Sequence, residues 1–171
     1  IIPMKWIASL IVSLFSIAVS AQDSMSLHYK IYDTRSKQIV TVDKIVADMA
    51  EADVLFFGEE HNDSAGHYLE NRIFRPLHAQ YGDKLALSME MFESDNQLAL
   101  DEYLAGKIDA ARFAKDVRLW SNYRDYRPMV EYDKEKNIPV IAANPPRRYV
   151  TLVGRRGMKA LDSLSADAKY F

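Results

Sequence analysis

The fold and the candidate site are best predicted from residues 54–63, which are Val54-Leu55-Phe56-Phe57-Gly58-Glu59-Glu60-His61-Asn62-Asp63. Four apolar residues run directly into a glycine, two acids, a histidine and two residues that favour helix starts. A continuous apolar run that is rich in Val and Phe and ended by Gly predicts a strand buried on both faces. The polar residues then follow the carboxyl end of that strand, which is where ligands bind in open α/β sheets.

The polar part of this stretch has two interpretations. The carboxylates of Glu59 and Glu60 and the imidazole of His61 can together hold a metal ion, meet a cationic group or move a proton. Alternatively, they form an ordinary turn whose acids stabilise the amino end of the following helix. The polar residues are denser than capping requires, which favours a ligand site.

Composition narrows the classes of protein to which the chain can belong. Its 171 residues suffice for one domain with a real core. The net charge of −2 and the absence of a Lys/Arg run argue against a nucleic-acid partner. The sequence has no cysteine, which excludes disulfides, thiolate metal sites, thiol nucleophiles and lipid attachment through Cys.

The amino-terminal residues have the pattern of a secretory signal peptide. A basic start at Met4-Lys5 precedes an apolar region, and small residues before Gln22 offer a cleavage site after Ala21. The apolar region is short for a membrane-spanning helix, although an uncleaved anchor is the alternative. We therefore expect residues 1–21 to be a signal peptide that truly starts at Met4. The exported protein would be periplasmic or associated with the cell surface, and it would not be a lipoprotein because it has no Cys.

A helix is expected to follow the opening stretch. Asp63 or Ser64 can cap it, apolar residues recur at three- and four-residue spacing, and Gly82 ends it, while Pro76 should kink or divide it. His67 lies on the first turn of this helix, close to the end of the preceding strand. His61 and His67 can therefore share one site, whereas His67 by itself would suit a solvated surface.

Strand and helix patterns alternate along the remaining chain. Residues 27–32 and 38–42 suit a hairpin, residues 85–92 and 138–143 suit buried strands, and Pro128 suits the first turn of a helix that ends at Asn137. This alternation predicts an α/β fold, with a mostly parallel sheet that has helices on both faces. Residues 22–171 would form the amino-terminal part of one such domain, incomplete at the carboxyl terminus.

Further polar residues fall at the ends of these predicted strands. Glu90 interrupts an apolar run, where an unpaired carboxylate is costly, so it must be protonated, hydrogen-bonded, paired or metal-bound unless it points outward. Arg147 and Arg148 follow the last strand and can meet carboxylates or propionates, or they are simply first-turn helix residues. The carboxyl ends of neighbouring parallel strands meet at one edge, so we expect these groups to converge.

Several blocks in the same order resemble a known family. They are Gly58-Glu59-Glu60-His61-Asn62-Asp63 followed by His67 and Glu70, Glu90-Met91-Phe92, Trp120 with Tyr126-Arg127-Pro128, and residues 138–148. Together they resemble the ChaN-like haem-binding uptake proteins, a branch of the Tiki/TraB/erythromycin-esterase superfamily. The resemblance covers residues 27–171. This chain differs from the family in two respects. Many relatives are lipoproteins, whereas this chain has no Cys. The relatives are also considerably longer, so we expect this chain to be a carboxyl-terminally truncated piece.

This resemblance implies an exported haem- or iron-binding protein of an iron-uptake system. Haem would be the cofactor, bound by His61, His67, Arg147 and Arg148, and no motif fixes a ligating tyrosine. The family is described as binding haem face to face in a dimer, with Tyr and His ligands. A homodimer and an outer-membrane haem receptor are therefore the expected partners.

Two further interpretations remain open. The superfamily resemblance implies a metal-dependent hydrolase of the peptidase or esterase kind, in which Glu59, His61, His67 and Glu90 hold Zn or Mn. A metal ion lowers the pKa of its bound water to about 7, and Glu59, His61 and Glu90 would be the catalytic residues. The third interpretation is an interaction module whose polar cluster only orders the turn. The sequence favours a protein that is not an enzyme without deciding the matter.

Overall fold

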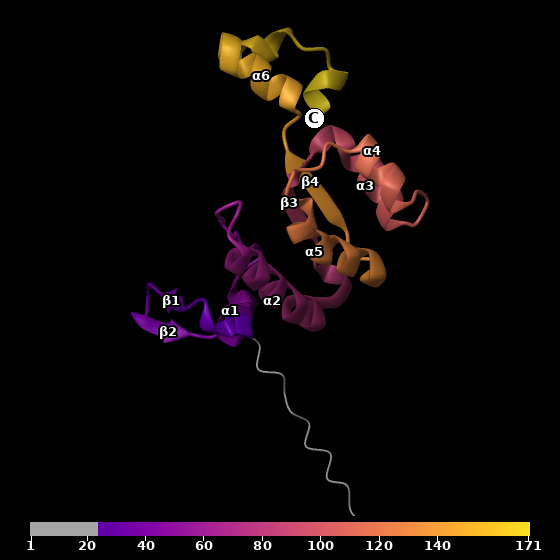
Figure 1. Ribbon diagram of the computed structural model, residues 1–171. Coiled ribbons are helices and arrows are strands. Elements are labelled where there is room, and N and C mark those ends of the chain that lie inside the picture. The colour runs from indigo at the N-terminus through magenta and orange to yellow at the C-terminus, as the bar shows by residue number, and fades with distance from the viewer. Residues whose placement is uncertain (1–23) are drawn as a thin grey trace, which may run out of the picture.

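The computed structural model describes residues 24–171, and the expected signal peptide lies outside this range. Within it, none of the helices combines the length and hydropathy that a membrane crossing needs. The strands are β1 (Ile31–Asp33), β2 (Gln38–Val40), β3 (Leu87–Glu93) and β4 (Val140–Asn144). The α-helices are α1 (Val42–Asp48), α2 (Ser64–Tyr81), α3 (Gln97–Leu104), α4 (Ala110–Asp116), α5 (Tyr123–Lys136) and α6 (Arg147–Arg156), as Figure 1 shows.

The strands form two separate pairs. β1 and β2 make the predicted antiparallel hairpin, and β3 and β4 make a parallel pair. In the parallel pair Leu87 lies opposite Val140 and Met89 opposite Ala142, but the register then shifts so that Glu93 lies opposite Asn144. Parallel pairing and the mixed α/β class are confirmed. The larger sheet is not found among the described residues, which are mostly helical.

The prediction of a buried central strand at residues 54–57 is wrong. These residues belong to no strand pair and are largely exposed, with Val54 62% and Phe56 91% accessible. An apolar run becomes a strand buried on both faces only when neighbouring strands flank it and helices cover it. Among residues 24–171 the two strands of the parallel sheet pair with each other and leave this segment unpaired.

The core forms where helices pack on the parallel pair. α3 contacts β4, α4 and α5, and α5 also contacts α2 (Figure 1). The cluster of buried side chains includes Met89 and Phe92 of β3, Leu100 of α3, Phe113 of α4 and Val130 of α5. This core holds β3 and α5 in place. These two elements carry Glu90 and Tyr126 of the candidate site described below.

α2 carries the helix-start signals that the sequence predicts. The Asp63 side chain accepts a hydrogen bond from the Ala65 amide at 3.0 Å, and the helix ends where Gly82 adopts a φ of 57°. Ile73 and Leu77 are buried as the apolar spacing predicts. Pro76 lies inside α2 without dividing it, so the helix runs unbroken from the candidate site to Tyr81.

α5 begins earlier than predicted. It starts at Tyr123 and not near Pro128, and it ends at the left-handed residue Asn137 as expected. Tyr126, Met129 and Val130 are all buried, and their spacing matches one face of a helix. Burial of that face stabilises the amino-terminal turn of α5. Tyr126 lies in this turn and contacts Glu59, which follows residues 54–57.

Candidate functional site

The candidate site lies where the loop after residues 54–57 meets β3. Glu59 and His61 belong to this loop, and Glu90 projects from β3. Ligand atoms of these three residues lie within 4.8 Å of one another, which is close enough for a single metal ion to contact them all. The structure thus brings together three of the four residues that the sequence selects as metal ligands, and the fourth, His67, lies directly behind Glu59.

Glu59 is the buried centre of this cluster, since its side chain is only 5% exposed. Its Oε1 accepts a hydrogen bond from the Tyr126 hydroxyl at 2.7 Å and lies 2.9 Å from His61 Nδ1. Its Oε2 lies 3.1 Å from His67 Nε2 but is buried without a hydrogen-bond partner among the described residues. A carboxylate removed from water needs such partners, and here they tie the loop to α2 and α5.

His61 is oriented on several sides. Glu59 holds Nδ1, the Trp120 ring meets the imidazole edge-on at 4.9 Å, and the His61 carbonyl accepts a hydrogen bond from Asn122 Nδ2 at 2.6 Å. The side chain is still 54% exposed, and its Nε2 lies 3.8 Å from Glu90 Oε1. When a carboxylate holds one imidazole nitrogen, the other nitrogen is well placed to bind a metal.

The pKa of His61 is raised above its usual value. The hydrogen bond with Glu59 raises it most, burial opposes the rise, and the charges of Glu59, Glu90 and Glu60 add to it. A proton on Nε2 excludes a metal from that nitrogen. Binding of a metal at His61 should therefore strengthen as the pH rises through this raised pKa.

Glu70 adds a second buried acid beside Glu59. Burial, followed by the charge of Glu59, a hydrogen bond with Glu59 and the charge of Glu90, raises the pKa of Glu70 to about 8. Glu70 is therefore mostly protonated at neutral pH, so it adds little negative charge beside Glu59. Glu70 belongs to the family motif, but the sequence alone predicts no role for it.

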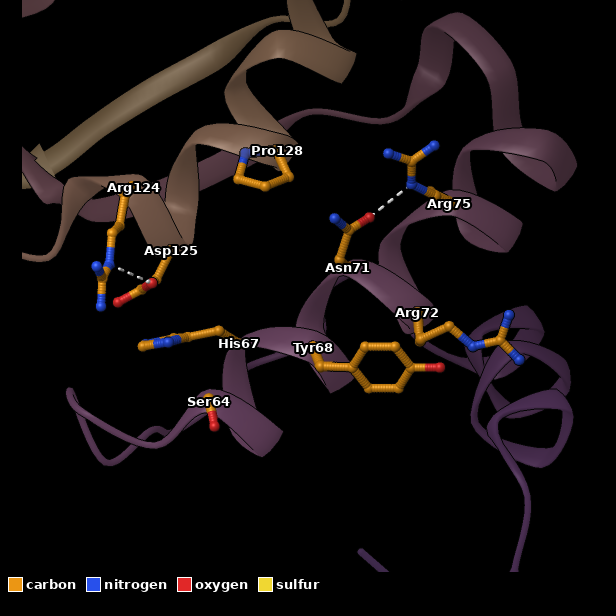
Figure 2. Close-up of a pocket in the computed structure, with 9 residues that line it drawn as sticks. All are labelled: Ser64, His67, Tyr68, Asn71, Arg72, Arg75, Arg124, Asp125 and Pro128. Atoms are coloured by element: carbon orange, nitrogen blue, oxygen red, sulfur yellow. Dashed lines mark hydrogen bonds and ion pairs between the residues drawn. The ribbon is translucent and has the colours of Figure 1, made fainter. Parts of the chain in front are cut away.

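His67 is a buried residue, so its interpretation as a solvated surface histidine is wrong. It is 6% exposed, and its Nε2 lies 3.1 Å from the Tyr126 hydroxyl oxygen. The Tyr126 proton is directed to Glu59, so this hydroxyl accepts from His67 Nε2. His67 Nδ1 has no hydrogen-bond partner within residues 24–171, and the ring lines a cavity between α2 and α5 (Figure 2).

Arg147 and Arg148 lie at the carboxyl end of β4, where they contact Glu93, the last residue of β3, and Asp95, two residues beyond it. The Arg147 amide donates a hydrogen bond to Glu93 Oε2 at 2.7 Å, and its Nε lies 3.6 Å from Glu93 Oε1. Arg148 pairs with Asp95. Burial raises the pKa of Glu93, but hydrogen bonds from Arg118 and the Arg147 amide bring it below its usual value. The predicted role of Arg147 and Arg148 in haem binding stays a prediction.

Residues 45–171 match the family described as haem-binding uptake, Tiki superfamily, ChaN. This chain belongs to the ChaN family. The match covers most of the sequence and includes Glu59, His61, His67 and Glu90. The prediction of the family from the sequence blocks is therefore confirmed.

One solved structure shows the same fold. The structure, described as cofacial heme binding to ChaN of Campylobacter jejuni, is similar with a TM-score of 0.64 and 20% sequence identity. The alignment covers 74% of this chain and 52% of that chain, so this ChaN family member spans about half the length of its relative. No curated protein matches this sequence.

The structure adds supporting residues to those that the ChaN family motif selects. Tyr126 and Trp120 belong to the sequence blocks that resemble the family, but the sequence alone predicts no role for them or for Asn122. All three come from the start of α5 or the turn before it, and they contact Glu59 or His61. The four-residue spacing of Asn122 and Tyr126 would have indicated a common helix face, had α5 been predicted to begin at Tyr123.

Proposed function

We propose that this chain is an exported haem-binding protein of an iron-uptake system, in which His61 Nε2 binds the haem iron. The observation that carries the proposal is the orientation of His61. Glu59 holds one of its nitrogens, and the other lies on a half-exposed side chain at the protein surface. Membership of the haem-binding uptake family supports haem as the ligand.

The surroundings of His61 suit a flat apolar ligand. Phe56 is 91% exposed and Phe57 is 37% exposed, and the two lie a few residues before His61 in an unpaired segment. The Trp120 ring adds an aromatic wall at the imidazole. Haem sites combine an apolar slot with an axial nitrogen, oxygen or sulfur ligand, so these residues fit the group. Bound haem would supply iron that an imidazole nitrogen can ligate.

The other residues of the cluster have supporting roles in this proposal. Glu59 and Tyr126 fix the His61 ring, and the buried His67 supports Glu59, since its Nε2 lies 3.1 Å from Glu59 Oε2. Secretion by means of residues 1–21, a periplasmic or surface location, a haem-linked homodimer and an outer-membrane receptor belong to the same proposal. They rest on the signal-peptide pattern and on the family.

A hemin titration of the full-length protein tests this proposal. We expect a saturable, shifted Soret band that His61→Ala removes, because the substitution deletes the iron ligand. Glu59→Gln should weaken hemin binding by about 10–100-fold, the usual cost of losing the partner that orients a metal-bound histidine. The affinity should rise with pH, since the raised pKa of His61 keeps Nε2 protonated in mildly acidic solution.

His28→Ala serves as the matched control, since His28 is an exposed histidine outside the cluster. It should bind hemin like the wild type. A spectrum that neither shifts nor saturates in the wild type would contradict the proposed function. An equal loss in the His28 and His61 variants would contradict the role of His61.

The geometry also favours a second candidate function, a metal-dependent hydrolase. The observation behind it is that ligand atoms of Glu59, His61 and Glu90 lie within 4.8 Å of one another. A Zn or Mn ion there would polarise bound water and supply a nucleophile at neutral pH. Glu90 is 53% exposed, so its carboxylate can act as a ligand or as a base.

Glu90→Gln separates the two candidates. Haem binding through His61 does not need the Glu90 carboxylate, so the hemin affinity should change little. A three-ligand metal site loses one ligand, so the metal content after dialysis against Zn or Mn should fall from near one ion per chain towards zero. Elemental analysis beside the hemin titration makes the comparison. An unchanged metal content would remove the metal candidate.

A further inference from the structure

A cavity of about 450 Å³ lies next to the Glu59–His61–Glu90 cluster and is lined by residues of α2 and α5. It lies between the first half of α2 and the amino end of α5, and His67 lines it (Figure 2). Asn122, which immediately precedes α5, donates a hydrogen bond to the His61 carbonyl, and Arg124 of the cavity wall follows two residues later. The cavity and His61 therefore share the junction between the loop and α5.

The cavity has an excess of positive charge. Arg72, Arg75 and Arg124 line it, and Asp125 is the one acid among its lining residues. The Arg72 side chain has no ion pair or hydrogen bond within residues 24–171. Arg75 donates to the Asn71 side-chain oxygen at 2.6 Å, and its guanidinium lies 4.4 Å from the centroid of the Tyr132 ring. Arg124 is 89% exposed and meets its neighbour Asp125 at 3.4 Å. Three arginines thus line the cavity together with one acidic residue.

Two buried polar atoms on the cavity wall also lack partners. His67 Nδ1 and the Tyr68 hydroxyl oxygen are both inaccessible and without a hydrogen bond among the described residues. Figure 2 shows the His67 ring between Ser64 and the Arg124–Asp125 pair, while the Tyr68 ring points the other way, toward Arg72. An unpaired buried polar group is unfavourable. The Tyr68 hydroxyl can donate a hydrogen bond to a carboxylate, whereas His67 Nδ1 is an acceptor when Nε2 carries the proton and does not contribute to carboxylate binding.

We propose that this cavity binds the carboxylates of an anionic ligand, and that it receives the propionates of haem. The second part rests on the proposed function. Guanidinium groups pair with carboxylates through two parallel hydrogen bonds, and both α2 and α5 begin at the cavity, where the helix dipole favours negative charge. Arg147 and Arg148 are already paired with Glu93 and Asp95, whereas Arg72 and Arg124 have no distant acid to displace.

The test compares hemin with its dimethyl ester, in which the propionates carry no charge. We use the wild type and the double variant Arg72→Gln/Arg124→Gln, which removes two exposed guanidinium groups that make few contacts. The double variant should raise the hemin Kd about tenfold or more, because hydrogen bonds to charged groups are lost. The ester should bind both proteins equally and more weakly than hemin binds the wild type.

Arg155→Gln on α6 is the control for a general loss of positive charge, since Arg155 is exposed and outside the cavity. It should leave the hemin Kd unchanged. Equal hemin affinities of the wild type and the double variant would overturn the proposal, and so would an equal effect of Arg155→Gln. An unchanged melting temperature of the double variant shows that folding is intact.

A citrate titration by calorimetry separates this inference from the proposed function. If the wild type binds no hemin but binds citrate, and the double variant loses citrate, the cavity is a carboxylate site for a ligand other than haem. In that case the proposed function fails while the site stands. If the wild type binds neither hemin nor citrate, both are overturned.

Discussion

Phe92→Ala is expected to lower the free energy of unfolding by about 3–5 kcal/mol, the usual cost of emptying a large core position. Phe92 is fully buried on β3, and its ring lies 6.0 Å from that of Phe113 and 6.2 Å from that of Tyr123. The substitution removes apolar area from the core and leaves a space that strands and helices fixed by other contacts cannot close. Urea denaturation followed by circular dichroism measures the loss.

Phe56→Ala provides the matched comparison, because Phe56 is the same residue type at 91% exposure. Its effect should stay within about 0.5 kcal/mol, as for other surface substitutions. The pair also tests the unpaired state of residues 54–57. A loss at Phe56 as large as that at Phe92 would mean that this segment is buried in solution and would contradict the structure.

Asp133→Asn is expected to abolish a loss of stability on going from acid to mildly alkaline solution. Asp133 is fully buried on α5, neither carboxylate oxygen has a hydrogen-bond partner among the described residues, and burial raises its pKa to about 8. The folded state therefore binds a proton that the unfolded state, with its ordinary pKa near 3.8, has released. The stabilisation is complete below pH 4 and is lost as the pH rises through about 8.

The asparagine variant should match the wild type near pH 4 and exceed it in stability near pH 9. The difference at high pH should be on the order of a few kcal/mol, since each unit of pKa shift corresponds to about 1.4 kcal/mol. Chemical denaturation across this pH range measures it, with Asp83→Asn as the exposed control. Parallel pH profiles for wild type and Asp133→Asn would show that Asp133 is not buried and unpaired.

The sequence predicted best those features that are decided locally. Asp63 caps α2 through its own side chain, and Gly82 and Asn137 adopt left-handed conformations that end helices. These signals act within one helical turn, so the neighbouring residues suffice to recognise them. The parallel pairing of β3 with β4 also followed from the alternation of strand and helix patterns.

The errors concern interactions between distant parts of the chain. Whether residues 54–57 are buried depends on strands that pair with them, and hydropathy does not report pairing. The Tyr126 hydroxyl meets Glu59, 67 positions earlier, so no local pattern could reveal that contact. Arg147 and Arg148 were selected for their charge, yet charge alone does not show that Glu93 and Asp95 lie beside them.

The register shift in β3 makes the number of residues in this strand important for both the candidate site and the core. Between the pairs Met89–Ala142 and Glu93–Asn144, β3 has three residues where β4 has one. Glu90 and Phe92 would share a face in a regular strand, yet Glu90 is exposed and Phe92 is fully buried. Removing one residue from this interval would turn the acid inward or the ring outward. Homologous chains should therefore vary in residue type here more readily than in residue number.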